Sequence, residues 1–153
     1  MAAGTYTSYN GHTKYVQDGT FDLDTDSITC WLLTSAYTPS ASHDSFSDIT
    51  AAELSHASYT GGSNGGILLT TKAISQVSGK QYKFASDAIT QSFASTDATF
   101  KYAVLGERNA TAANAKLLGY IDLNTGGGSV TVTAGNPLTI NCPTNGWFYT
   151  TGS

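Results

Sequence analysis

Short runs of alternating apolar and polar residues, separated by glycine-rich turns, constrain this chain more than any other feature of its sequence. The clearest runs are residues 28–33, 81–85, 99–105 and 138–142. Apolar side chains at every second position predict strands, because successive side chains of a strand point to opposite faces. Residues 28–33 carry large apolar groups at both parities, which predicts a strand buried on both sides.

Further runs at residues 67–77, 89–93, 116–123 and 130–133 extend the strand pattern, and Trp147 to Tyr149 extend or cap its end. Ser78-Gly79-Lys80 predicts a hairpin connection. Within residues 1–20 we expect a short helix that ends near Gly19, since glycine commonly follows the last helical residue. The sequence therefore predicts one mostly β domain over residues 1–153, an antiparallel β-sandwich or barrel with a short N-terminal helix. The role of the tail, residues 141–153, stays open.

The charge content narrows the classes of partner. Only 12% of the residues are charged, Lys and Arg total 7, and the net charge is −4. Such a chain has no basic surface that could collect phosphates, so we expect no direct nucleic-acid binding. No apolar stretch approaches the length of a membrane span, and residues 1–7 lack signal-peptide features, so we expect synthesis in a cytosol and no membrane contact. Cys30 and Cys142 form no CxxC motif, and we expect both to be buried reduced thiols.

Motifs that suggest a metal site fail on inspection. Asp22, Asp24 and Asp26 resemble the start of a calcium loop, but Ser27 stands where the turn glycine belongs and Leu33 where the bidentate glutamate belongs. The histidines, which we expect at the surface, show neither HxH nor HxxxH spacing. They are His12, His43 and His56. We expect no metal and no cofactor.

Motifs that suggest catalysis are equally weak. Ser63 sits in a GxSxG match, but a strand-forming run follows it where a nucleophile elbow needs a helix. Asp44 and Asp48 lie four residues apart in a polar stretch, which is too common a spacing to indicate the paired acids of a glycosidase. We therefore expect no catalytic residues and no enzymatic activity.

Aromatic residues outside the clearest strands are the candidates for partner binding. Tyrosine and tryptophan bury much area at low entropy cost and are enriched in interfaces. They can instead pack the edges of their own domain, or they can form platforms that bind sugars. The candidate partner-binding residues are Tyr6, Tyr9, Tyr37, Tyr59, Trp147, Phe148 and Tyr149.

Several segments, in order and spacing, resemble a family of small virion proteins encoded by tailed bacteriophages and prophages. The most telling is residues 32–39, LLTSAYTP. The likeness spans the chain up to about Ile140, and the tail from Cys142 to Tyr149 fits it less well. The other matching segments are residues 9–19, 24–28, 43–44, 46–49, 59–62, 101–105 and 117–123.

The resemblance implies a structural, non-enzymatic part of the virion. The role it favours is a capsid decoration or cement protein, which binds the outer shell and stabilises the packaged head. Its implied partners are the major capsid protein and other copies of itself, after synthesis in the bacterial host cytoplasm. The alternative is a carbohydrate-binding or adhesion module of a phage tail or fibre, and these possibilities stay open at the level of the sequence.

Overall fold

The computed structural model describes residues 4–151, which form short strands, one helix and two single 3-10 turns. The helix α1 spans Gly11–Gln17, and the turns η1 and η2 span Phe46–Asp48 and Thr50–Ala52. The strands are β1 (Thr7–Ser8), β2 (Ile28–Leu33), β3 (Ile67–Leu68), β4 (Ala73–Ser78), β5 (Gln81–Ala85), β6 (Ile89–Ser92), β7 (Ala98–Phe100), β8 (Tyr102–Glu107), β9 (Leu117–Asp122), β10 (Val130–Val132), β11 (Pro137–Ile140) and β12 (Phe148–Thr151).

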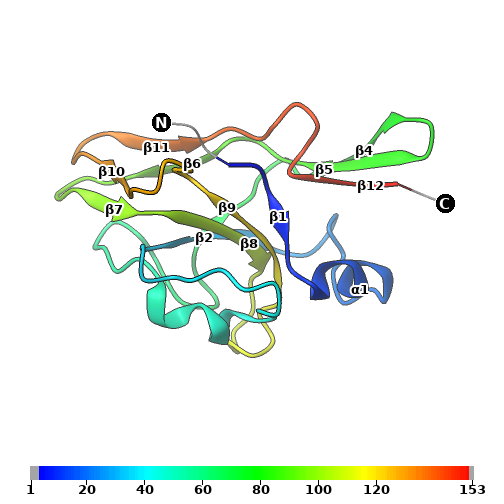
Figure 1. Cartoon of the computed structure of the whole chain (residues 1–153), viewed down its shortest axis with the longest axis horizontal. Helices are drawn as coiled ribbons and strands as arrows, with labels where there is room; N and C mark the ends of the chain where they lie inside the picture. The colour runs from blue at the N-terminus through cyan, green and yellow to red at the C-terminus, as the bar shows by residue number, and fades with distance from the viewer. Residues whose placement is uncertain (1–3, 152–153) are drawn as a thin grey trace.

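The strands make two layers rather than a closed barrel. One layer is a five-stranded sheet in the order β1-β9-β8-β2-β3, which β7 and β10 continue at one end. The other layer contains the pair β11-β6 and the three-stranded sheet β12-β5-β4 (Figure 1). All strand pairings within residues 4–151 are antiparallel. The prediction of a mostly β, sandwich-like fold with a short N-terminal helix is confirmed.

The central strand β2 is buried on both faces, as its sequence predicts. Ile28, Cys30 and Leu32 point into the core between the two layers. Trp31 and Leu33 point the other way, into a second core that the loop carrying η1 and η2 covers. All six residues of β2 are buried. Both faces of the five-stranded sheet are therefore covered, which explains why β2 does not alternate between apolar and polar residues.

Two predicted strands are each divided in the structure. The run 67–77 splits into β3 and β4 around Thr71, which has a positive φ of 50°. The run 99–105 splits at Lys101, whose N–H donates to the Leu33 carbonyl at 2.8 Å and whose carbonyl accepts from Leu123 at 2.8 Å. The chain passes from β7 to β8 at this point, because the backbone of Lys101 bonds outside the β7–β10 pair.

The two ends of the chain meet the predictions differently. The helix α1 ends just before Gly19, which has a φ of 76°, so the helix prediction is confirmed. The prediction that Trp147 to Tyr149 extend or cap the strand before them is wrong, because β12 is a separate strand that pairs with β5 in the three-stranded sheet. Both cysteines are free. Cys30 is buried, but Cys142 is partly exposed, so the prediction of burial is wrong for Cys142.

Candidate functional site

A cavity of about 520 Å³ lies between the beginning and the end of the described chain. Segments 4–8, 12–17 and 143–149 line it, so β1, α1, the loop before β12 and β12 itself all contribute. We call it the terminal cavity. Its volume falls within the range of about 300–1,000 Å³ that is typical of small-molecule sites.

Aromatic rings form one wall of the terminal cavity. Phe148 stacks on Phe84 with ring centroids 5.3 Å apart, and it meets the Tyr6 ring at the same centroid distance. The imidazole of His12 lies nearly perpendicular to the Phe148 ring, with centroids 4.3 Å apart. Tyr149 is 60% exposed at the rim. The wall is therefore fixed by ring packing inside and leaves one large ring accessible outside.

His12 is the one histidine of this cavity, and it is only 5% exposed, so the expectation of a surface position is wrong for it. The helix α1 places it against β9, where its Nδ1 lies 3.1 Å from the Leu118 carbonyl and 3.0 Å from the Tyr6 hydroxyl. Burial lowers the pKa of His12, which favours the neutral imidazole near pH 7. His43 and His56 are partly exposed.

The second ring nitrogen of His12, Nε2, has no hydrogen bond within residues 4–151. No buried side-chain nitrogen or oxygen lacks a partner in this part of the chain. Since His12 as a residue is buried, its Nε2 must reach accessible space, and the accessible space that His12 lines is the terminal cavity. The imidazole therefore offers one hydrogen-bonding nitrogen to a ligand there.

The remaining polar side chains of the cavity are neutral. Thr5, Ser8 and Thr13 offer hydroxyl groups, and Gln17 and Asn145 offer amides. None of these five side chains makes a hydrogen bond to another group of the described chain. Among the described residues that line the cavity there is no Asp, Glu, Lys or Arg. The cavity thus combines aromatic surface with uncharged donors and acceptors.

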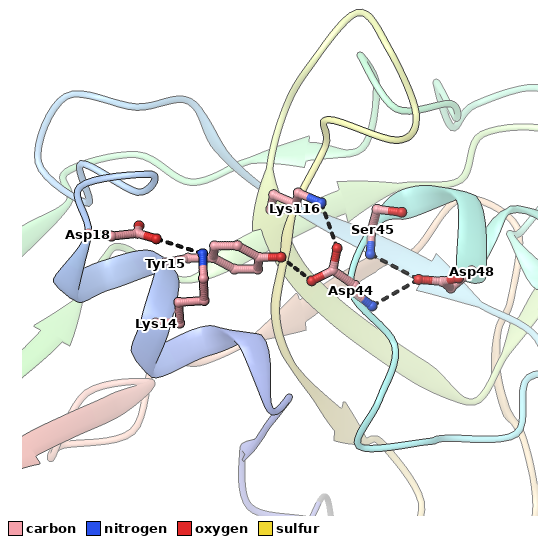
Figure 2. A network of polar contacts seen from close by, with 7 residues as sticks. All are labelled: Lys14, Tyr15, Asp18, Asp44, Ser45, Asp48 and Lys116. Atoms are coloured by element: carbon pink, nitrogen blue, oxygen red, sulfur yellow. Dashed lines mark hydrogen bonds and ion pairs between the residues drawn. The ribbon is translucent and has the colours of Figure 1, made fainter.

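A polar network on the opposite side of α1 holds the helix in place (Figure 2). The Tyr15 hydroxyl donates to the Asp44 carboxylate. Lys116 forms an ion pair with the same carboxylate, with its Nζ 2.5 Å from Oδ2. Burial of Asp44 opposes its ionisation, but these bonds outweigh the burial and lower the pKa of the carboxyl. The helix wall of the terminal cavity is therefore fastened to the body of the protein.

Asp48 completes this network by accepting hydrogen bonds from the backbone N–H groups of Asp44 and Ser45, at 2.8 and 3.0 Å. Figure 2 shows Asp44 and Asp48 turned toward different partners rather than toward a shared space. Their contacts are those of structural carboxylates. Lys14 and Asp18 form a further ion pair of 2.7 Å along the exposed side of α1.

The hairpin formed by β4 and β5, which belongs to the sheet β12-β5-β4, extends beyond the body of the molecule (Figure 1). All six residues of β4 are exposed, and none is charged. Ile74 and Tyr82 lie on the same face of the hairpin and are 52% and 48% exposed, and Val77 is 43% exposed. Within the described chain β4 pairs only with β5, so its outer edge has free backbone groups. We call β4 together with Tyr82 the hairpin surface.

Four of the seven predicted partner-binding residues lie in the interior. Tyr9 and Tyr37 share a hydrogen bond of 2.6 Å within the second core, Tyr59 donates to Glu53 at 3.0 Å, and Trp147 donates from Nε1 to Ser86 at 2.9 Å. All four are at most 6% exposed. Their ring faces are covered by their own chain, so they are not available as platforms for a sugar or a partner.

The structure brings the other three candidates together at the terminal cavity. They are Tyr6, Phe148 and Tyr149. The sequence analysis missed His12 as part of this group, as well as Ile74 and Tyr82 on the hairpin. The sequence contains no signal for this accessible edge, because natural edge strands usually carry charges or proline and the run from Ala73 to Ser78 has neither.

The motifs around Ser63 and Asp22, which weakly suggested catalysis and metal binding, form ordinary loops and turns in the structure. The residues after Ser63 lead into β3 and not into a helix, which removes the strand–turn–helix geometry of an elbow. Asp22 accepts hydrogen bonds from the N–H groups of Asp24 and Thr25, at 3.1 and 3.2 Å, as in an ordinary turn. Within residues 4–151 no group of three His, Cys, Asp or Glu side chains is arranged to hold a metal ion.

No family model matches the chain, and neither does any curated protein or solved structure. In the part of the chain that the structure describes, no helix has both the length and the apolar character needed to cross a membrane.

Proposed function

We propose that this protein is a structural component of a bacteriophage virion, a decoration protein that binds the capsid surface and stabilises the packaged head. The observation that carries the proposal is the hairpin surface. It combines an edge strand with no charge, free backbone groups and the exposed apolar side chains Ile74, Val77 and Tyr82. The resemblance of segments such as residues 32–39 to small virion proteins supports the same role.

The chemistry of the hairpin surface suits adhesion to a protein. Exposed apolar side chains gain free energy when a partner removes them from water. A strand with a free edge can also accept a further strand, whose backbone hydrogen bonds add to that gain. Because β4 carries no charge, such a contact depends little on salt. The major capsid protein is the proposed partner.

The proposed mechanism is linkage between binding and shell stability. A protein that binds the assembled shell but not the free subunits stabilises the shell by mass action. Many copies multiply a modest interface into a large total. Two covered cores and a clamped helix make the domain a rigid block, which transmits load between coat subunits without itself deforming.

The test uses virus particles that lack this protein. We expect them to release DNA at a lower temperature than complete particles, and we expect added purified protein to restore the higher temperature. An Ile74→Lys/Tyr82→Ser variant should bind the particles at least tenfold more weakly. A Thr139→Lys variant, on the exposed side of β11, is the matched control and should bind as the wild type does. Particles that keep full heat resistance without the protein would contradict the proposal.

A further inference from the structure

We propose that the terminal cavity binds a neutral saccharide. The proposal does not depend on capsid binding, because it concerns different residues. The cavity has the volume of a small-molecule site, about 520 Å³, and it contains a buried histidine whose Nε2 reaches the open space. His12 is held through Nδ1 by the Leu118 carbonyl and the Tyr6 hydroxyl, which leaves Nε2 free to bond a ligand in the cavity.

The charge of the lining excludes ionised ligands. No acidic or basic side chain lines the described cavity, so a phosphate, a carboxylate or an ammonium group would lose water without gaining an opposite charge. Burial lowers the pKa of His12, so the imidazole supplies no positive charge near neutral pH. The ligand that fits this environment is therefore uncharged.

The polar groups favour a ligand with many hydroxyl groups. Ser8 and Thr13 each donate and accept, and so do the amides of Gln17 and Asn145. Nε2 of His12 donates in one tautomer and accepts in the other, and a ligand hydroxyl satisfies either. An aromatic or aliphatic ligand would fill the cavity but leave these groups to water. A sugar can pair with several of them at once.

The aromatic groups match the apolar face of a sugar ring. Tyr149 is 60% exposed at the rim and offers its ring to a ligand, while the neighbouring Phe148 packs on Phe84, Tyr6 and His12. The C–H groups of one face of a pyranose pack favourably on such rings. The same cavity thus contains both aromatic surface and neutral hydrogen-bonding groups, and a neutral saccharide requires this combination.

The test is a titration of the full chain with neutral disaccharides, followed by tryptophan fluorescence and by ligand-observed NMR. The probes are maltose, lactose, chitobiose and mannobiose, and sialyllactose is the charged counterpart of lactose. We expect at least one neutral probe to bind with a Kd below about 10 mM. No binding of any neutral probe at that concentration would overturn the proposal, and so would equal or tighter binding of sialyllactose.

Two variants assign the binding to the terminal cavity. Tyr149→Ala removes the exposed ring and Asn145→Ala removes an amide, and each should weaken binding about tenfold. Tyr82→Ala is the matched control, because its ring is similarly exposed but belongs to the hairpin surface. It should leave saccharide binding unchanged and weaken particle binding, so the two proposals fail separately. Saccharide binding that is insensitive to both cavity variants would overturn the assignment.

Discussion

A Gly119→Ala substitution, which adds one methyl group, should test how firmly β1 is attached to its sheet. Gly119 lies in β9 between β1 and β8, opposite Ser8 and Leu105. A Cβ atom added there would overlap the carbonyl oxygen of Thr7 and the ring of Tyr6. The Tyr6 side chain can turn aside, but the Thr7 oxygen belongs to the backbone of β1. A Gly119→Ala substitution must therefore push β1 away from the sheet.

The size of the effect follows from the overlap. Overpacking of this kind costs about 1–3 kcal/mol of unfolding free energy. In a protein of this length 1 kcal/mol corresponds to about 2–4 °C, so the melting temperature should fall by roughly 2–12 °C. Thermal unfolding followed by circular dichroism measures this change. Hydrogen exchange adds a local measure, because the amides of Gly4 and Tyr9 donate to Asp122 and Leu118 only while β1 is attached.

The control is Gly128→Ala, in an exposed turn where the added Cβ would approach only Asn124, at 3.2 Å. This variant should melt as the wild type does. If Gly119→Ala melts within about 1 °C of Gly128→Ala and its Gly4 and Tyr9 amides exchange at the wild-type rate, β1 is not packed as described. The terminal cavity would then lack the wall that the structure gives it.

Three further outcomes test other contacts. Ellman's reagent should label Cys142 in the folded protein and reach Cys30 only after denaturation, because burial raises the pKa of the Cys30 thiol to about 12. Folding lowers the pKa of His12, so the unfolded chain binds the proton more tightly than the folded chain does. The unfolding free energy should therefore fall as the pH drops below about 6.5, by at most ~1.4 kcal/mol per pH unit. Urea titrations of His12→Gln should lack this pH dependence. Asp44→Asn weakens the bonds in Figure 2 that fasten α1 and should cost about 1 kcal/mol in the same titrations, whereas Asp18→Asn, at a solvent-exposed pair, should cause no measurable change.

Local patterns were sufficient to predict most strands. Residues 28–33 carry large apolar groups at both parities, and both sides of β2 are covered. Ser78-Gly79-Lys80 separates β4 from β5 as predicted. The divisions within residues 67–77 and at Lys101 were not predictable, because neither place contains glycine or proline. Long-range backbone bonds end the strands there, and these depend on segments distant in sequence.

The terminal cavity could not be predicted for the same reason. It exists because β1 pairs with β9 and β12 pairs with β5, which brings segments 4–8 and 143–149 to one cavity beside α1. A tyrosine in a loop gives no indication of which side will be covered. Tyr9 and Tyr149 are each followed by a polar residue, yet one is buried and the other is exposed.

The position of β2 in the middle of its sheet has a consequence for biosynthesis. The ribosome makes this apolar strand early, but β8, on which it pairs, begins at Tyr102. About 70 residues must be added in between, which takes about 4–14 s at ~5–20 residues per second. During that time the nascent chain carries an apolar strand that lacks its main partner. Chaperones that hold such segments, or slower growth at low temperature, should therefore raise the yield of native protein.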